Sequence, residues 1–152
     1  MAMTAFHFHL EKVLNWRRTQ LELAEVEFRR ETAALAELDR LSTELQTRGT
    51  QTAAEVRGFS PLSGGDLAAL DGFRLYVERR AKELAAQRAE QLRKLAVCEE
   101  AMLEARRRCR LLERLRERRL AEWRSATARE LEQLAAESYL ARFARESSIM
   151  DE

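Results

Sequence analysis

The residues best suited to bind a charged partner are the arginines of residues 106–119. This stretch holds eight arginines and two glutamates, the largest local imbalance of charge in the chain. The arginines are Arg106, Arg107, Arg108, Arg110, Arg114, Arg116, Arg118 and Arg119. An arginine-rich helix can bind DNA phosphates, but the net charge is only +1 and the asparagine-containing pattern of bZIP basic regions is missing. A nucleic acid and a solvated face are the alternatives, and the pattern favours an acidic protein surface.

Other chemically active residues do not form a recognisable catalytic or metal-binding pattern. His7 and His9 are two residues apart, so a helix places them on different faces and not as the i,i+4 pair of zinc sites. Cys98 and Cys109 would lie on one helix face about 16 Å apart along the axis, too far to bond to each other. We expect core thiols in a reducing compartment. The sequence contains no glycine-rich phosphate loop and no nucleophile elbow, so we expect neither an enzyme nor a cofactor or metal site.

Two sets of aromatic residues are candidates for partner contacts. Phe73, Tyr76 and Val77 lie beside the predicted hinge, where they could pack the hairpin or dock a partner. Trp16 and Trp123 could lie in the core or at an interface. Trp is over-represented at binding hot spots, and the pattern favours an interface for Trp123.

Two long helices are expected to carry these residues. All five glycines and the single proline fall between residues 49 and 72, and these residue types are the strongest helix breakers. We predict a first helix over about residues 4–48, a hinge over 49–66 and a second helix over about 67–146. Asp66 is the expected N-cap of the second helix.

The apolar residues of the first helix follow coiled-coil spacing. Leu14, Leu21, Phe28 and Leu35 recur every seven residues. The composition, 35% charged and 45% hydrophobic, is also that of a coiled coil or long helix. We therefore predict an all-α fold with a single domain over 1–152, a long antiparallel two-helix coiled-coil hairpin.

The predicted helices differ in length, so the second should extend beyond the first. Folding back near Phe59 would place Phe6 opposite Leu112 and leave residues 113–146 without a partner in the chain. Large apolar side chains nevertheless occupy this overhang: Leu115, Leu120, Trp123, Leu131, Leu134, Tyr139, Leu140 and Phe143. Such a helix is prone to aggregate unless another protein covers it. A two-helix seam also offers no enclosed catalytic pocket.

The sequence lacks the features of a membrane-inserted or exported chain. No run approaches the roughly 18 to 20 apolar residues that would span a bilayer, so we expect no direct membrane insertion. The N-terminal residues have neither the basic region nor the apolar core of a signal peptide. We therefore expect a cytoplasmic protein.

Several motifs, taken in order, resemble those of the FliJ family of the bacterial flagellum. The opening FHFHLEKVL (6–14) followed by Arg17 and Arg18 is similar to that family's F-x-F-x-L-x-x-(V/L)-L-x-x-R start. LERLRERR (112–119) is similar to its L-E-(K/R)-L-x-E-(K/R) motif, and ELEQLA (130–135) with YLARF (139–143) to its terminal pattern. Cys98 and Cys109 have no assigned role in the family.

The resemblance implies a stalk subunit of the flagellar type III export apparatus, located at the cytoplasmic face of the inner membrane in the basal body. In that family the long helix penetrates the hexameric export ATPase FliI, and a second surface contacts the export gate protein FlhA. FliH and export chaperones are further implied partners, and an escort role for flagellar substrates or their empty chaperones is the alternative. We assign ring contacts to Arg107, Arg114, Arg118, Trp123 and Leu131. We assign gate contacts to Phe73, Tyr76 and Val77.

Overall fold

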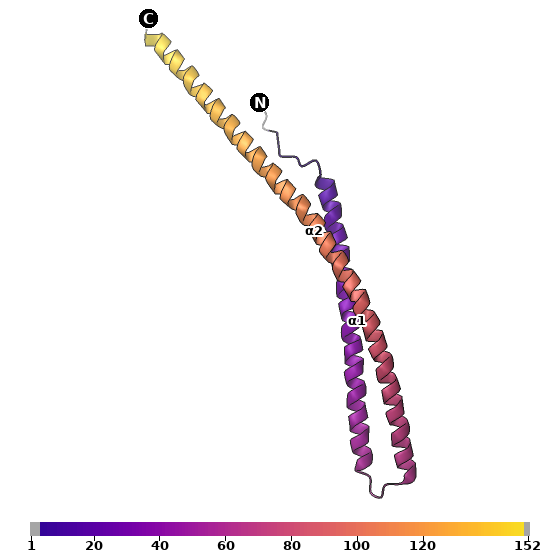
Figure 1. The fold of residues 1–152 in the computed structure, drawn as a ribbon. Helices are drawn as coiled ribbons and strands as arrows, with labels where there is room; N and C mark the ends of the chain where they lie inside the picture. Colours follow the sequence, from indigo (N-terminus) through magenta and orange to yellow (C-terminus); the bar gives the residue numbers. More distant parts are fainter. Residues whose placement is uncertain (1–3, 151–152) are drawn as a thin grey trace. The chain divides into compact units, whose positions relative to one another are not determined.

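The chain forms an antiparallel two-helix hairpin, as the sequence predicts. The structure is a computed structural model that describes residues 4–150. Within them, α1 (Glu11–Arg57) and α2 (Gly64–Met150) are joined by the short loop 58–63, as Figure 1 shows. The all-α prediction is confirmed.

The loop is much shorter than the predicted hinge over 49–66. α1 continues through Gly49, whose position lies against α2: a Cβ built there would be 3.5 Å from Cγ1 of Val77. A glycine inside a helix costs about 1 kcal/mol relative to alanine, and packing against a neighbouring helix outweighs such a local cost. α1 ends where the Gly58 N–H donates to the carbonyls of Ala54 and Glu55.

The N-cap of α2 is Ser63 and not Asp66, because the helix begins three residues earlier than predicted. The backbone N–H of Asp66 donates to Oγ of Ser63 at 3.1 Å, and the backbone N–H of Ser63 donates to Oδ2 of Asp66 at 3.0 Å. These reciprocal bonds form a capping box. Hydrogen bonding of the Asp66 carboxylate to the Ser63 side chain, followed by that to the Ser63 backbone N–H, lowers the pKa of Asp66, because it favours the charged form.

Residues 4–10 are not helical, although a helix was predicted from residue 4. Phe6 is half-buried and Phe8 is buried, whereas His7 and His9 are exposed. Alternate residues of an extended chain point the same way, but residues two apart on a helix do not. An extended path therefore turns both phenylalanines toward the protein, which a helix would not do.

Contacts divide the chain into two compact units, which are described separately. The first combines residues up to Arg18 with residues from Arg107 onward, and the second is Thr19–Arg106. In the second unit, Leu70 and Leu84 are buried between the helices. The amide of Gln91 is buried as well, and it donates to the backbone carbonyl of Glu31 at 3.0 Å and to the carboxylate of the same residue. This polar residue of the seam thus has its partner on the opposite helix.

The first unit is built from the non-helical N-terminal segment, the start of α1 and the C-terminal part of α2. Its buried side chains are Phe8, Leu14 and Cys109. They come from three separate stretches of the chain, and Leu14 is the most completely buried of them. This small core fixes the N-terminal segment along α2.

Candidate partner-binding surfaces

The arginine run is divided between residues that have partners within the chain and residues that do not. Three arginines form ion pairs: Arg106 with Glu25 at 3.7 Å, Arg116 with Glu11 at 3.0 Å and Arg119 with Glu122 at 3.1 Å. Arg107 and Arg108 also interact within the chain. Five of the eight arginines therefore contribute to the fold or to the local helix surface.

The remaining three arginines form an exposed row. Arg110, Arg114 and Arg118 are exposed and have no ion pair with any residue between 4 and 150. Their spacing of four residues places them on one side of α2, over about 12 Å of its axis. Trp123 follows Arg114 by nine residues, or two and a half turns, so the row faces away from the side that Trp123 occupies.

Trp123 has a partner within the chain, so the expectation that it lies on an unpartnered overhang is wrong. Its ring centroid is 6.0 Å from that of Phe6, and the guanidinium of Arg116 lies 5.8 Å from the Phe6 ring centroid. Phe6 thus lies beside Trp123 and not beside Leu112 as predicted. An extended chain rises about 3.3 Å per residue against 1.5 Å in a helix, so residues 4–10 reach farther along α2. The assignment of Trp123 to a partner contact stays a prediction.

Cys109 belongs to the small core of the first unit. Its Sγ lies 3.7 Å from Oε1 of Glu113, which also accepts a 3.5 Å hydrogen bond from Nε of Arg18. Burial, followed by the negative charge of Glu113, raises the pKa of the Cys109 thiol, which keeps it protonated and poorly nucleophilic. Both cysteines are free, and Cys98 is half-buried. The predicted core role is confirmed for Cys109.

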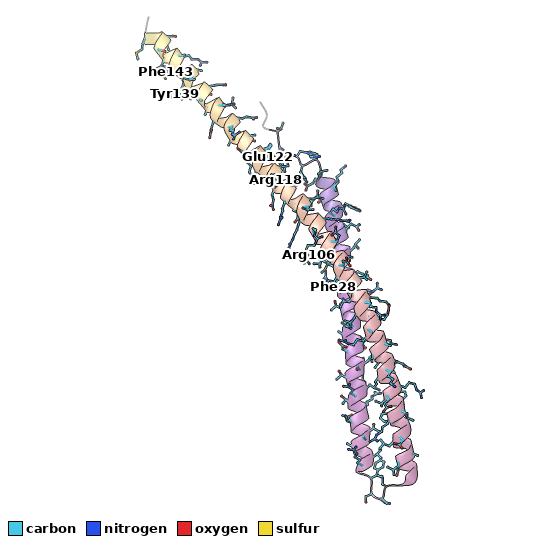
Figure 2. The ribbon with its side chains drawn as sticks, viewed as in Figure 1. Phe28, Arg106, Arg118, Glu122, Tyr139 and Phe143 are labelled. Atoms are coloured by element: carbon cyan, nitrogen blue, oxygen red, sulfur yellow. The ribbon has the colours of Figure 1, made fainter. Side chains whose placement is uncertain are left out.

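Residues 128–150 of α2 have no other part of the described chain against them. Every residue from 128 to 150 is exposed, and Figure 2 shows Tyr139 and Phe143 on this part of the helix. Tyr139 is 70% exposed and Phe143 is 61% exposed. The unpartnered segment therefore exists, but it begins near residue 128 and not at 113.

Apolar side chains lie on two sides of this segment. Leu131 and Leu134 continue the side of Trp123, because the steps 123, 127, 131 and 134 follow helical spacing. Phe143 follows Leu134 by nine residues and therefore points to the opposite side. The exposed apolar surface thus surrounds much of the helix and does not form one stripe.

The predicted gate residues lie in the second unit, near the start of α2. The rings of Phe73 and Tyr76 have centroids 6.3 Å apart. Phe73 and Val77 are half-buried, and Tyr76 is exposed. Phe73 and Val77 line a shallow open groove beside Gly49, and Tyr76 lines a second one with Leu84. The cluster therefore packs the hairpin and also presents surface, and docking of a partner there stays a prediction.

Trp16 is an exposed aromatic residue of α1. It lies in the first unit, and the guanidinium of Arg17 is 4.7 Å from its ring centroid. Its side chain is 53% exposed and is not part of the core, and an interface role for it stays a prediction.

Sequence reasoning missed one member of the arginine row and one residue beside it. Arg110 was not assigned to any site, and Leu111 was not considered, although it is 61% exposed. Their positions could have been found from spacing, because Leu111 precedes Arg114 by three residues and Arg118 by seven.

Comparison of the chain with protein-family models, curated proteins and solved structures gave no match. Between residues 4 and 150, neither helix has a stretch long and apolar enough to cross a membrane. The same residues contain no cluster of three or more His, Cys, Asp or Glu that could hold a metal ion.

Proposed function

We propose that this chain is a non-enzymatic subunit of the bacterial flagellar type III export apparatus, at the cytoplasmic face of the inner membrane. It acts as a central stalk that promotes assembly and activity of the hexameric export ATPase FliI and couples the ATPase to the export gate protein FlhA. The motif order that resembles the FliJ family supports the choice of apparatus, and the two-helix hairpin agrees with it.

The observation that carries the proposal is the bare helix formed by residues 128–150. All of these residues are exposed, including large apolar side chains at Leu131, Leu134, Tyr139 and Phe143. An apolar surface of this kind is characteristic of an interaction site. A partner that covers it gains the free energy of apolar burial, about 25 cal/mol per Å².

The distribution of these side chains supports a socket and not a flat partner surface. Leu134 and Phe143 lie on opposite sides of the helix, so a partner touching one side would leave the other in water. A helix with apolar residues on several sides is typically buried all round. A ring that surrounds the helix satisfies this requirement, whereas one helix packed alongside does not.

The gate contact is assigned to the cluster of Phe73, Tyr76 and Val77. The exposed part of Tyr76 and the shallow groove beside Gly49 offer an aromatic and apolar contact in the second unit. Because Phe73 and Val77 also pack the hairpin, Tyr76 is the residue of choice for a test. Tyr76→Ala should weaken binding to FlhA and leave stimulation of the ATPase unchanged.

The ring contact is tested by reversing charge on the arginine row. Arg114→Glu with Arg118→Glu should abolish stimulation of the export ATPase in a coupled ATP-hydrolysis assay. Lys82→Glu with Lys94→Glu is the matched control, because both lysines are exposed and the change in net charge is the same. Equal stimulation by the two double variants would refute the placement of the ring contact.

The apolar part of the contact needs its own variant. Tyr139→Ser with Phe143→Ser should also reduce stimulation, and Val97→Ser, at an exposed position of the second unit, should not. Native mass spectrometry should find one copy of this chain per six ATPase subunits.

The exposed apolar side chains of residues 128–150 also favour an alternative, an escort that binds flagellar substrates or their empty chaperones. Stoichiometry separates the two functions. One copy per bound substrate or chaperone, without a complex of one copy with six ATPase subunits, would support the escort.

A further inference from the structure

Leu111 adds an exposed apolar side chain beside the N-terminal end of the arginine row. It is 61% exposed, and it lies on the side of α2 that carries the row, three residues before Arg114 and seven before Arg118. On a helix these separations make neighbours of the three side chains. The face thus combines one exposed leucine with the unpaired guanidiniums of Arg110, Arg114 and Arg118.

We propose that this face binds an acidic amphipathic α-helix of a partner protein, with an apolar residue over Leu111 and carboxylates over Arg110, Arg114 and Arg118. An apolar contact surrounded by charged groups is the usual anatomy of a protein interface. Guanidinium groups bind carboxylates through two parallel hydrogen bonds. The chemistry of the face therefore matches a helix that carries leucine-like and acidic residues together.

The spacing of the row fits a helix as the occupant. Arg110, Arg114 and Arg118 present one charge per helical turn, at intervals of about 6 Å. Carboxylates four residues apart on a second helix repeat at the same interval. Two helices that pack along each other can therefore form several such pairs without distortion of either backbone.

A nucleic acid fits this face less well. A phosphate backbone offers no apolar group for Leu111, and nucleic-acid-binding domains carry a broad basic footprint with a pI above about 9. The pI of this chain is about 7.8. Charge and apolar content together favour an acidic protein helix.

The inference rests on the proposed function for the identity of the partner, since it names the chemistry of the ATPase surface that meets the row. The recognition chemistry itself can be measured without the ATPase. A failure of the proposed binding chemistry is therefore distinguishable from a failure of the proposed ATPase function.

The test uses a synthetic peptide, held helical by an i,i+4 crosslink, with leucines and glutamates on one face. Fluorescence anisotropy should detect its binding to the full-length chain. The triple variant Arg110→Glu, Arg114→Glu and Arg118→Glu should bind at least about tenfold more weakly, because three attractions become repulsions. Leu111→Ser should bind about fivefold more weakly, because it removes the apolar contact.

Matched controls decide the outcome. Lys82→Glu with Lys94→Glu, and Val97→Ser, should bind the peptide as the wild type does. A peptide of the same composition with leucines and glutamates on opposite faces should bind weakly, as should a DNA duplex. Equal binding of either of these probes, no binding of the first peptide, or an unchanged Leu111→Ser variant would overturn the inference.

The ATPase assay separates the two proposals. If the peptide binds as expected but Leu111→Ser stimulates the ATPase normally, the acidic-helix surface stands and its assignment to the ATPase falls. If the peptide does not bind and the wild-type chain stimulates normally, the surface assignment falls and the stalk function stands.

Discussion

The paired helices of the second unit and the bare helix of residues 128–150 are made from similar residues but differ in what they bury. In the second unit Leu84 is 3% exposed, whereas Leu140 in the bare segment is 64% exposed. Both stretches are rich in leucine, alanine, glutamate and arginine. The difference is therefore one of partners and not of helix-forming tendency.

In this chain, helix formation depends on the local residue types, whereas tertiary stabilisation depends on contacts between the helices. Leucine, alanine, glutamate and arginine all favour a helix, so α2 stays helical to Met150 without a second helix beside its end. Burial and cross-helix bonds such as Arg88 Nε to Asp39 Oδ1 at 2.7 Å occur where α1 or the segment before it lies alongside α2. The bare segment thus keeps its apolar side chains available for another molecule.

The largest expected loss of stability comes from truncating a leucine that is buried between α1 and α2. Leu84→Ala should lower the free energy of unfolding by about 2 to 5 kcal/mol, because it removes a buried side chain and leaves a cavity. Leu140→Ala, the matched change on the bare segment, should change it by less than about 0.5 kcal/mol. Urea denaturation followed by circular dichroism measures both, and similar losses would break the comparison.

A smaller loss of stability is expected at Phe6, whose ring contacts Trp123 shortly before the exposed segment 128–150 begins. Phe6→Ala should cost about 1 to 3 kcal/mol, since it removes the ring contact with Trp123 and the stacking of Arg116. The fluorescence of Trp123 should shift to longer wavelength as water reaches its ring. Trp16→Phe removes the background signal of the second tryptophan, and an unshifted spectrum would show that Phe6 does not cover Trp123.

Removal of the buried Gln91 amide should lower the free energy of unfolding by less than removal of the Leu84 side chain. It should lower it by more than loss of an exposed ion pair. Gln91→Ala should cost about 1 to 2 kcal/mol, because it removes a buried hydrogen bond to Glu31. Arg88→Ala, which breaks the exposed pair with Asp39, should cost less than about 1 kcal/mol. Equal losses in urea denaturation would mean that burial does not separate the two sites.

The smallest effect is the pH dependence of the start of α2. Because the pKa of Asp66 is lowered in the folded chain, its capping bonds stabilise the helix above the unfolded pKa. That contribution is lost as the pH falls through the folded pKa. An NMR titration should place the Asp66 carboxyl below its ordinary pKa, and Ser63→Ala should move it back up. No change on substitution would contradict the capping box.

Much of the paired region could be predicted from the sequence, and its boundaries could not. Heptad spacing identified Leu14, Leu21, Phe28 and Leu35, all at least half-buried. Glycine positions suggested a hinge that begins at Gly49, but packing against Val77 keeps that residue helical. Helix propensity reflects only the local sequence, so it predicts the wrong conformation for residues that a neighbouring helix holds in place.

The candidate site was predicted only in part for a related reason. The density of arginine was evident from the sequence, but which arginines have partners depends on residues far along the chain, as in the pair of Arg116 and Glu11. The helix predicted over about residues 4–48 included Phe6 and Phe8. Their alternate spacing was the available signal for an extended segment.

The residue types alone specify a helical chain with one interruption, because they favour helix everywhere except near the glycines and the proline. The register of the two helices, the contact of Phe6 with Trp123 and the loss of contacts near residue 128 follow from packing. Helix propensity belongs to each short stretch, whereas burial and ion pairing depend on which distant side chains come within contact distance.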